Sequence, residues 1–224
     1  MNRSWRIFAC FCMSLILCLM LCGCGVLKKV ASAEVVEGIS TETLLAEADT
    51  TSGYALAKQS GILEEDWKEF TFKLNSVVIT LPCTATNLEG VGLKMDTSFM
   101  AEDTIVNRGN RESVYFKNEF GDAILVTFMN PDRLPKALNE CLVTGIAVTE
   151  YDLTGRHLTV TFPGGVELGS EKSTALIAYG SEYELYESDA VHMYTWHDSS
   201  SYYKSCEIDY DAESLKACSM FLNF

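Results

Sequence analysis

The chain has 224 residues, of which 48% are hydrophobic and 11% aromatic, as is typical of a globular protein rather than a disordered one. This length allows one substantial domain or two small ones that share a core. The 17 basic and 31 acidic residues give a formal net charge of −14. So anionic a surface repels a phosphate backbone, which disfavours nucleic acid as a partner.

Two arginines, Arg3 and Arg6, precede an apolar stretch over residues 7–21. A short positive region followed by a hydrophobic one is the layout of an export signal. Continued through Leu27, the same run is also long enough to cross a bilayer as a retained helix. The flanking charges do not decide between the two, because the lysines at positions 28 and 29 balance the arginines.

The apolar run ends in Leu21-Cys22-Gly23-Cys24, which resembles a bacterial lipobox. The resemblance implies that residues 1–23 are a lipoprotein signal peptide and that Cys24 carries the lipid, because the diacylglyceryl group is transferred to a thiol. Cys22 does not substitute for it, since the bulky Leu21 would then stand directly before the cut. Lipidation of Cys24 is therefore favoured over a retained helix. Two or more acyl chains give durable attachment to a membrane.

The predicted location is the extracytoplasmic face of the cell membrane. In a cell with two membranes the outer membrane is also compatible, because Gly25 stands where an aspartate commonly retains lipoproteins at the inner membrane. Residues 24–66 are rich in Ala, Ser, Thr, Gly and Glu and show no sustained apolar period. This composition predicts an acidic, flexible tether that follows the lipidated residue.

Short runs of alternating apolar and polar residues begin at Phe70 and are separated by turn residues, a pattern that predicts β-strands. Two halves of this region share an order of elements. Each opens with a strand that ends in a proline, Pro82 or Pro163, continues with a short helical or loop segment, and closes with an antiparallel meander. The sequence therefore predicts an α+β fold of antiparallel sheets with short helices. We expect two related helix-plus-sheet units in tandem, over residues 67–150 and 151–224.

A short helix is predicted over residues 171–179, with Ser170 as its N-cap and Gly180 as its stop. This pattern of glycine, short helix and "YG" resembles the SmpA/OmlA and beta-lactamase-inhibitor-protein-like superfamily, although Glu182 stands where that family usually has a proline. The region from Phe70 to Leu222 is also similar to uncharacterised secreted lipoproteins of low-GC Gram-positive bacteria. These resemblances imply a helix packed on a curved sheet that binds proteins rather than catalysing a reaction.

No catalytic, cofactor or metal site is predicted. His192 and His197 are separated by an odd number of positions, so on a strand they point to opposite faces and do not readily chelate one metal. Alternating carboxylates near the C-terminus are superficially like a calcium loop; they are Glu207, Asp209, Asp211 and Glu213. However, Ser214 replaces the required glycine and Met220 replaces the bidentate glutamate. We therefore interpret this stretch as a solvated hairpin turn.

Four cysteines follow the tether, namely Cys83, Cys141, Cys206 and Cys218. Cys206 and Cys218 flank a predicted turn near Ala212, so they form the preferred candidate disulfide, and Cys83–Cys141 follows by elimination. Buried free thiols are the competing interpretation, because a domain of this size is large enough to fold without disulfide bonds. An envelope hydrolase or thiol enzyme that uses Cys83 or Cys206 is the alternative function.

The predicted partner surface is aromatic. In "VHMYTWHD", Tyr194 and Trp196 share one strand face, and Tyr202 and Tyr203 follow in the next loop. Exposed Tyr and Trp clusters are typical of protein interfaces. The opposite orientation, which buries Trp196, stays open because alternation does not choose the face. The predicted function is a lipid-anchored extracytoplasmic module without catalytic activity that binds a protein or envelope component.

Overall fold

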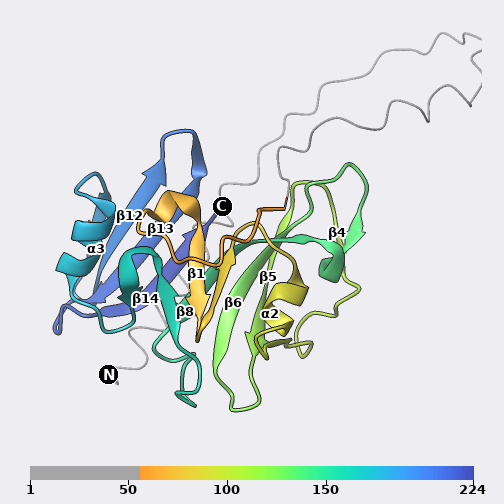
Figure 1. Ribbon diagram of the computed structural model, residues 1–224, viewed down its shortest axis with the longest axis horizontal. Coiled ribbons are helices and arrows are strands. Elements are labelled where there is room, and N and C mark those ends of the chain that lie inside the picture. The colour runs from red at the N-terminus through yellow and green to blue at the C-terminus, as the bar shows by residue number, and fades with distance from the viewer. Residues whose placement is uncertain (1–55) are drawn as a thin grey trace, which may run out of the picture. The chain divides into compact units, whose positions relative to one another are not determined.

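Two antiparallel sheets packed face to face form the body of the protein (Figure 1). The computed structural model describes residues 56–224, except for the side chain of Tyr202. The predicted signal peptide, Cys24 and most of the predicted tether lie outside the described residues. No helix within residues 56–224 is long and apolar enough to cross a membrane.

The larger sheet has eight strands in the order β11-β12-β13-β14-β8-β6-β5-β3. All of its pairings are antiparallel. The strands are β3 (Lys94–Met95), β5 (Arg111–Lys117), β6 (Ala123–Met129), β8 (Leu142–Thr149), β11 (Glu184–Glu187), β12 (Val191–Asp198), β13 (Ser201–Asp211) and β14 (Ala217–Asn223).

The smaller sheet has four strands in the order β10-β9-β1-β2. They are β1 (Thr71–Leu74), β2 (Val77–Thr80), β9 (Val160–Phe162) and β10 (Val166–Glu167). A separate two-stranded ribbon pairs β4 (Ile105–Val106) with β7 (Lys136–Ala137). The helices are α2 (Ala85–Glu89) and α3 (Lys172–Tyr179), with 3-10 turns η1 (Trp67–Glu69), η2 (Leu138–Glu140) and η3 (Pro163–Gly165).

The order of elements is the same in the two halves of the chain. Each half gives two strands to the small sheet, then a short helix, then four strands to the large sheet. The halves join twice, where β1 pairs with β9 and where β14 pairs with β8. The predicted α+β fold of antiparallel sheets and short helices is confirmed. That the halves are related tandem units stays a prediction, and each of the two packed sheets takes strands from both halves.

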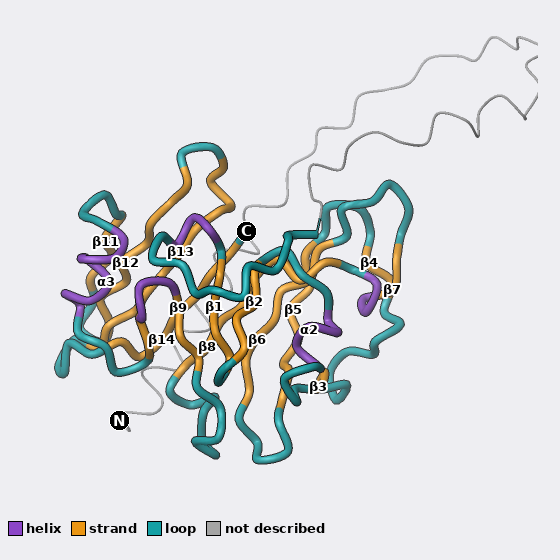
Figure 2. The backbone as a smooth tube through the Cα atoms, viewed as in Figure 1, coloured by secondary structure: helices purple, strands orange, loops and turns teal. Residues whose placement is uncertain are grey.

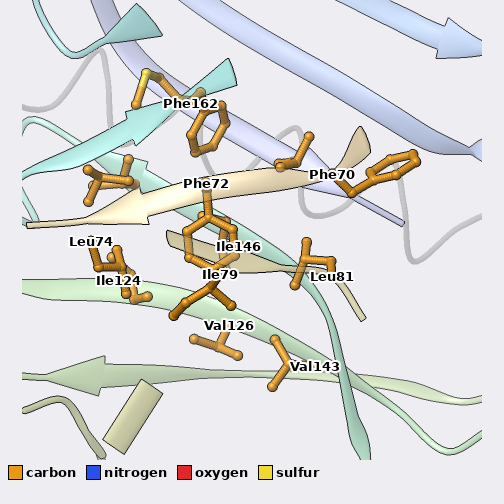
Figure 3. Packing of buried hydrophobic residues seen from close by; sticks show 14 of the residues in the cluster. Phe70, Phe72, Leu74, Ile79, Leu81, Ile124, Val126, Val143, Ile146 and Phe162 are labelled. Atoms are coloured by element: carbon orange, nitrogen blue, oxygen red, sulfur yellow. The ribbon is translucent and has the colours of Figure 1, made fainter. Parts of the chain in front are cut away.

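The core lies between the two sheets and continues beneath the helices, which flank the small sheet on the same side of the large one (Figure 2). Successive side chains of a strand point to opposite faces of its sheet, so every second residue points into this core, and these residues are mostly apolar. In Figure 3 side chains from the small sheet and the residue after it face side chains of the large sheet. The first group includes Phe72, Ile79 and Leu81, and the second includes Ile124, Val126, Val143 and Ile146.

Helix α3 begins one residue later than predicted and ends at Gly180, whose φ of 83° lies in the left-handed region that glycine tolerates. Its N-cap is Glu171, which makes no side-chain capping bond. The hydroxyl of Ser170, the predicted cap, instead accepts a hydrogen bond from the Glu167 N–H at 2.9 Å. Ser170 therefore holds the turn before the helix rather than the helix end itself.

Candidate binding face of the large sheet

The predicted aromatic surface is wrong for Tyr194 and Trp196. Each side chain is only 2% exposed. The Trp196 Nε1–H donates to the Gly180 carbonyl at 3.0 Å, and the Tyr179 ring packs edge-on against the indole at 5.2 Å. Helix α3 and the turn after it therefore cover this face of β12. Sequence alternation fixed the partition of β12 into two faces, but only the tertiary packing of α3 decides which one is buried.

The other two predicted residues lie elsewhere on β13. Tyr203 is exposed, and the Arg111 guanidinium lies 5.8 Å from the centre of its ring. Alternation along β13 places Tyr203 on the same face as Ser205 and Glu207, opposite to the face that α3 covers. Tyr202 has no described side chain. One member of the predicted set thus stands on the uncovered side of the sheet.

Within residues 56–224, no helix or strand packs on the second face of the large sheet, which we call the open face (Figure 1). Directly paired residues on neighbouring strands point to the same side, so the pairing register defines rows that cross this face. We call one of these the central row. It consists of Glu184, Thr195, Glu207, Phe221, Ala147, Leu125 and Tyr115.

The central row changes character along its length. Its acidic and hydroxyl residues lie on β11, β12 and β13, whereas β14, β8, β6 and β5 contribute Phe221, Ala147, Leu125 and Tyr115. The two apolar residues Phe221 and Leu125 and the aromatic Tyr115 are half-buried. An apolar centre bordered by polar groups is the anatomy of a protein interface.

Two carboxylates on β13 form the polar part of the open face. Glu207 and Asp209 are two positions apart on one strand, so both project from the open face. The Thr195 hydroxyl donates to Glu207 Oε2 at 3.0 Å. Desolvation by burial raises the pKa of Glu207, while the Thr195 hydroxyl and His197 act in the opposite direction. Glu207 is therefore protonated more readily than an exposed glutamate.

Asp209 is the more perturbed of the pair. Desolvation and the neighbouring charge of Glu207 raise its pKa well above the ordinary value, against a hydrogen bond from Ser219. The residue as a whole is half-buried, but its Oδ1 atom is closed to solvent and has no hydrogen-bond partner among the described residues. Perturbed carboxylates of this kind cluster at functional sites more often than elsewhere, which marks this part of the open face.

A histidine borders the carboxylate pair. His197 Nε2 lies 3.5 Å from Glu184 Oε2, and the register places His197 beside Ser205 on the open face. His192 pairs with Tyr210 and so belongs to the covered face, as the spacing of the two histidines predicts. Among residues 56–224, no group of three or more His, Cys, Asp or Glu side chains is arranged to hold a metal ion.

The preferred disulfide is wrong. Cys206 pairs with Leu222, whereas Cys218 lies at a bulge beside Tyr210, four positions along β13. At about 3.3 Å per strand residue, their Cα atoms are separated by roughly 13 Å, beyond the limit of about 7 Å for a disulfide. Cys83 and Cys141 are unpaired as well, so the second pairing also fails. The competing interpretation, free thiols, describes all four cysteines.

These thiols are poor nucleophiles. Cys83 and Cys206 are fully buried in the core. Burial raises the pKa of Cys83 to about 12 and that of Cys206 still further, so neither forms a thiolate near neutral pH.

Sequence reasoning placed Glu207 and Asp209 in a solvated turn, although their spacing of two on a strand is the signal that joins them on one sheet face. It missed Phe221, Leu125 and Tyr115 altogether. These three residues lie on three strands, and their alignment depends on a register that no local motif encodes.

Searches of protein-family models, curated proteins and solved structures find no match to this chain.

Proposed function

We propose that this protein is a lipid-anchored extracytoplasmic binding module that engages a protein or another envelope component through the open face of its large sheet. The observation that carries the proposal is the open face itself, an eight-stranded surface that no described helix or strand covers. The N-terminal sequence supports the proposed location at the membrane, since Cys24 ends a motif that resembles a lipobox.

The composition of the open face favours binding. Phe221, Leu125 and Tyr115 offer an apolar and aromatic centre, and Glu184 and Glu207 border it with acceptors. A partner that presents a hydrogen-bond donor to Glu184, whose side chain is exposed, would pair with an acceptor at the border of the apolar centre. A basic or hydroxyl-rich surface is therefore the complementary chemistry.

The observations do not favour the thiol enzyme. The two cysteines that it would use are buried with raised pKa values. A nucleophilic cysteine instead needs access to substrate and a lowered pKa. Binding without chemistry remains the better account of the described residues.

Crosslinking on intact cells tests the binding face. We would place a photo-crosslinking phenylalanine analogue at position 221, in the apolar centre, and at exposed position 77 on β2 as the matched control. A discrete adduct from position 221 that is missing from position 77 is expected. Leu125→Glu in the same background should remove that adduct, because it places a charge in the apolar centre, one strand beyond Ala147. No adduct at 221, or the same adducts at both positions, would overturn the open face as a binding surface.

Metabolic labelling with a fatty acid tests the anchor separately. Cys24→Ala should abolish the label, whereas Cys22→Ala, two positions earlier, should retain it. Label that persists in Cys24→Ala would show that the anchor is assigned to the wrong residue, whatever the open face binds.

A further inference from the structure

The ribbon of β4 and β7 and the loops that flank it expose three large apolar side chains. We call residues 97–110 and 130–140 the β4–β7 lobe. Phe99 is 90% exposed, Leu134 74% and Ile105 62%. Contiguous or clustered exposure of large apolar groups on a monomer marks an interaction site more often than scattered single residues do.

Hydrogen bonds hold the backbone around Ile105 and Leu134, so these two side chains do not protrude from loose loops. The Asn130 Nδ2 group donates to the Val106 and Leu134 carbonyls, each at 2.8 Å, and joins one loop to the ribbon. The Leu138 N–H donates to the Thr104 carbonyl at 2.9 Å. Val106 is buried next to the exposed Ile105, so β4 presents one face to the core and one outward.

The first described residues lie close to the segment that links the lobe to β8. The Ala57 N–H donates to the Pro82 carbonyl at 2.9 Å, and Cys83, the next residue, bridges to Val143. Only η2 and Cys141–Leu142 separate Val143 from β7. The ribbon and the backbone tube both place β4 at the opposite end of the domain from α3 (Figures 1 and 2). The chain from a membrane anchor upstream of residue 56 therefore enters the domain beside the segment that leads, through η2, to the lobe.

Charge distinguishes the lobe from the rest of the domain. It has three cations, Arg108, Arg133 and Lys136, against four anions. The remainder of residues 56–224 has 10 cations against 22 anions. Biological membranes carry anionic lipids, which repel a strongly acidic surface and tolerate a nearly neutral one that includes arginine and lysine.

We propose that the β4–β7 lobe rests in the interfacial layer of the lipid bilayer, with Phe99, Ile105 and Leu134 in contact with lipid. This inference rests on the proposed anchoring at Cys24. Tethering makes it effective, because three exposed apolar side chains bind a bilayer weakly by themselves, and attachment raises their effective concentration at the surface. The contact then fixes the orientation of the domain above the membrane.

Depth-dependent fluorescence quenching tests the contact. The full-length lipidated protein would carry Phe99→Trp or, as the matched control, Ile177→Trp on α3, where the native side chain is 86% exposed. Both would be reconstituted in vesicles of phosphatidylcholine and phosphatidylglycerol, with and without bromine on the acyl chains. The buried Trp67 and Trp196 are the same in both proteins. Bromine should cause a loss of emission in Phe99→Trp and none in Ile177→Trp.

The outcomes separate the lobe from the anchor. Vesicle flotation reports the anchor, and a protein that does not float would contradict the proposed function and the lobe contact with it. A protein that floats without quenching at position 99, or with equal quenching at both positions, would overturn the lobe contact alone. A blue shift of the tryptophan emission at position 99 that depends on protein concentration but not on bromine would show that the lobe binds a second copy of the chain. That result would overturn the lobe contact with the bilayer.

Discussion

The surroundings of Asp209 oppose its ionisation. Desolvation and the charge of Glu207 both favour the protonated form, so the folded state binds a proton there at a pH where the unfolded chain has released it. Because the folded-state pKa is raised, the contribution to stability is present below the ordinary carboxylate pKa of about 4 and is lost as the pH rises through the folded value. Asp209 therefore lowers stability at neutral pH relative to mildly acidic pH.

Asp209→Asn should remove this dependence. The variant cannot ionise, so its free energy of unfolding should fall less between mildly acidic and neutral pH than that of the unmodified protein. At neutral pH it should be the more stable of the two. Urea denaturation across this range measures the effect, and Asp189→Asn at an exposed position is the control. Parallel curves for Asp209→Asn and the unmodified protein would show that Asp209 ionises freely in the fold.

Asp122 acts in the opposite sense. Its burial disfavours ionisation, but the Arg156 and His157 backbone N–H groups donate to it at 2.9 and 2.7 Å, and with Asn118 they hold its pKa below the ordinary value. The stability that it contributes is present above the ordinary pKa and is lost as the pH falls further. Taken together, the contributions of Asp122 and Asp209 favour the folded state most near the ordinary carboxylate pKa.

The aromatic residues separate the covered face from the open face. Trp196→Ala should cost about 3–5 kcal/mol of unfolding free energy, because it opens a cavity beneath α3 and removes the bond to Gly180. Tyr203→Ala, which removes an exposed ring, should stay within about 0.5 kcal/mol. Denaturant unfolding of the two variants measures this contrast. Similar losses for both would place Trp196 outside the core.

Helix α3 packs closely against Gly164 of η3. A Cβ atom built on Gly164 would lie 2.3 Å from the Cβ of Ala178, a distance that no pair of real side chains shows. The adjacent Gly165 has a similar positive φ, 79° against 66°, but nothing within 4 Å of its added Cβ. The two positions therefore share the backbone strain of a substitution and differ chiefly in the contact with α3, since the nearest neighbour of the added Gly164 Cβ outside α3, the Glu65 carbonyl oxygen, lies at an ordinary 3.4 Å.

Gly164→Ala should consequently destabilise the protein more than Gly165→Ala, by about 1–3 kcal/mol, the usual cost of overpacking. The comparison uses the free energy of unfolding of each variant in urea, and near-ultraviolet circular dichroism reports the packing of Trp196 beneath the helix. Equal losses at the two positions would mean that Ala178 of α3 does not contact Gly164 of η3.

The elements with a strong local signal were predictable. Apolar alternation before Pro82 gave β1 and β2, and Gly180, which tolerates a positive φ, gave the end of α3. Which face of β12 is covered by α3 was not predictable, since Tyr194 and Met193, on opposite faces, are both suitable for a core. Only the path of the chain through α3 and Gly180 determines that the face of Tyr194 is buried. The mistaken disulfide also comes from a feature that no local motif encodes, because the hairpin turns between Asp211 and Lys216 rather than around Ala212, so that Cys206 pairs with Leu222.

The two halves of the domain depend on each other. Each sheet is completed by strands from both halves, through β1 with β9 and through β8 with β14. Separation would expose the edges of β8 and β14 along with the apolar layer that both sheets cover. The repeat in the order of elements therefore does not make the halves independent folding units.

Expression of residues 67–150 and 151–224 as separate fragments tests this dependence. Neither fragment should show a cooperative unfolding transition alone, because each leaves half of both sheets unpaired. The unbroken chain should unfold in one transition, seen alike by tryptophan fluorescence and by far-ultraviolet circular dichroism, since Trp67 and Trp196 report on different halves of one core. A fragment that unfolds cooperatively with a stability near that of the whole chain would instead establish the two halves as autonomous domains.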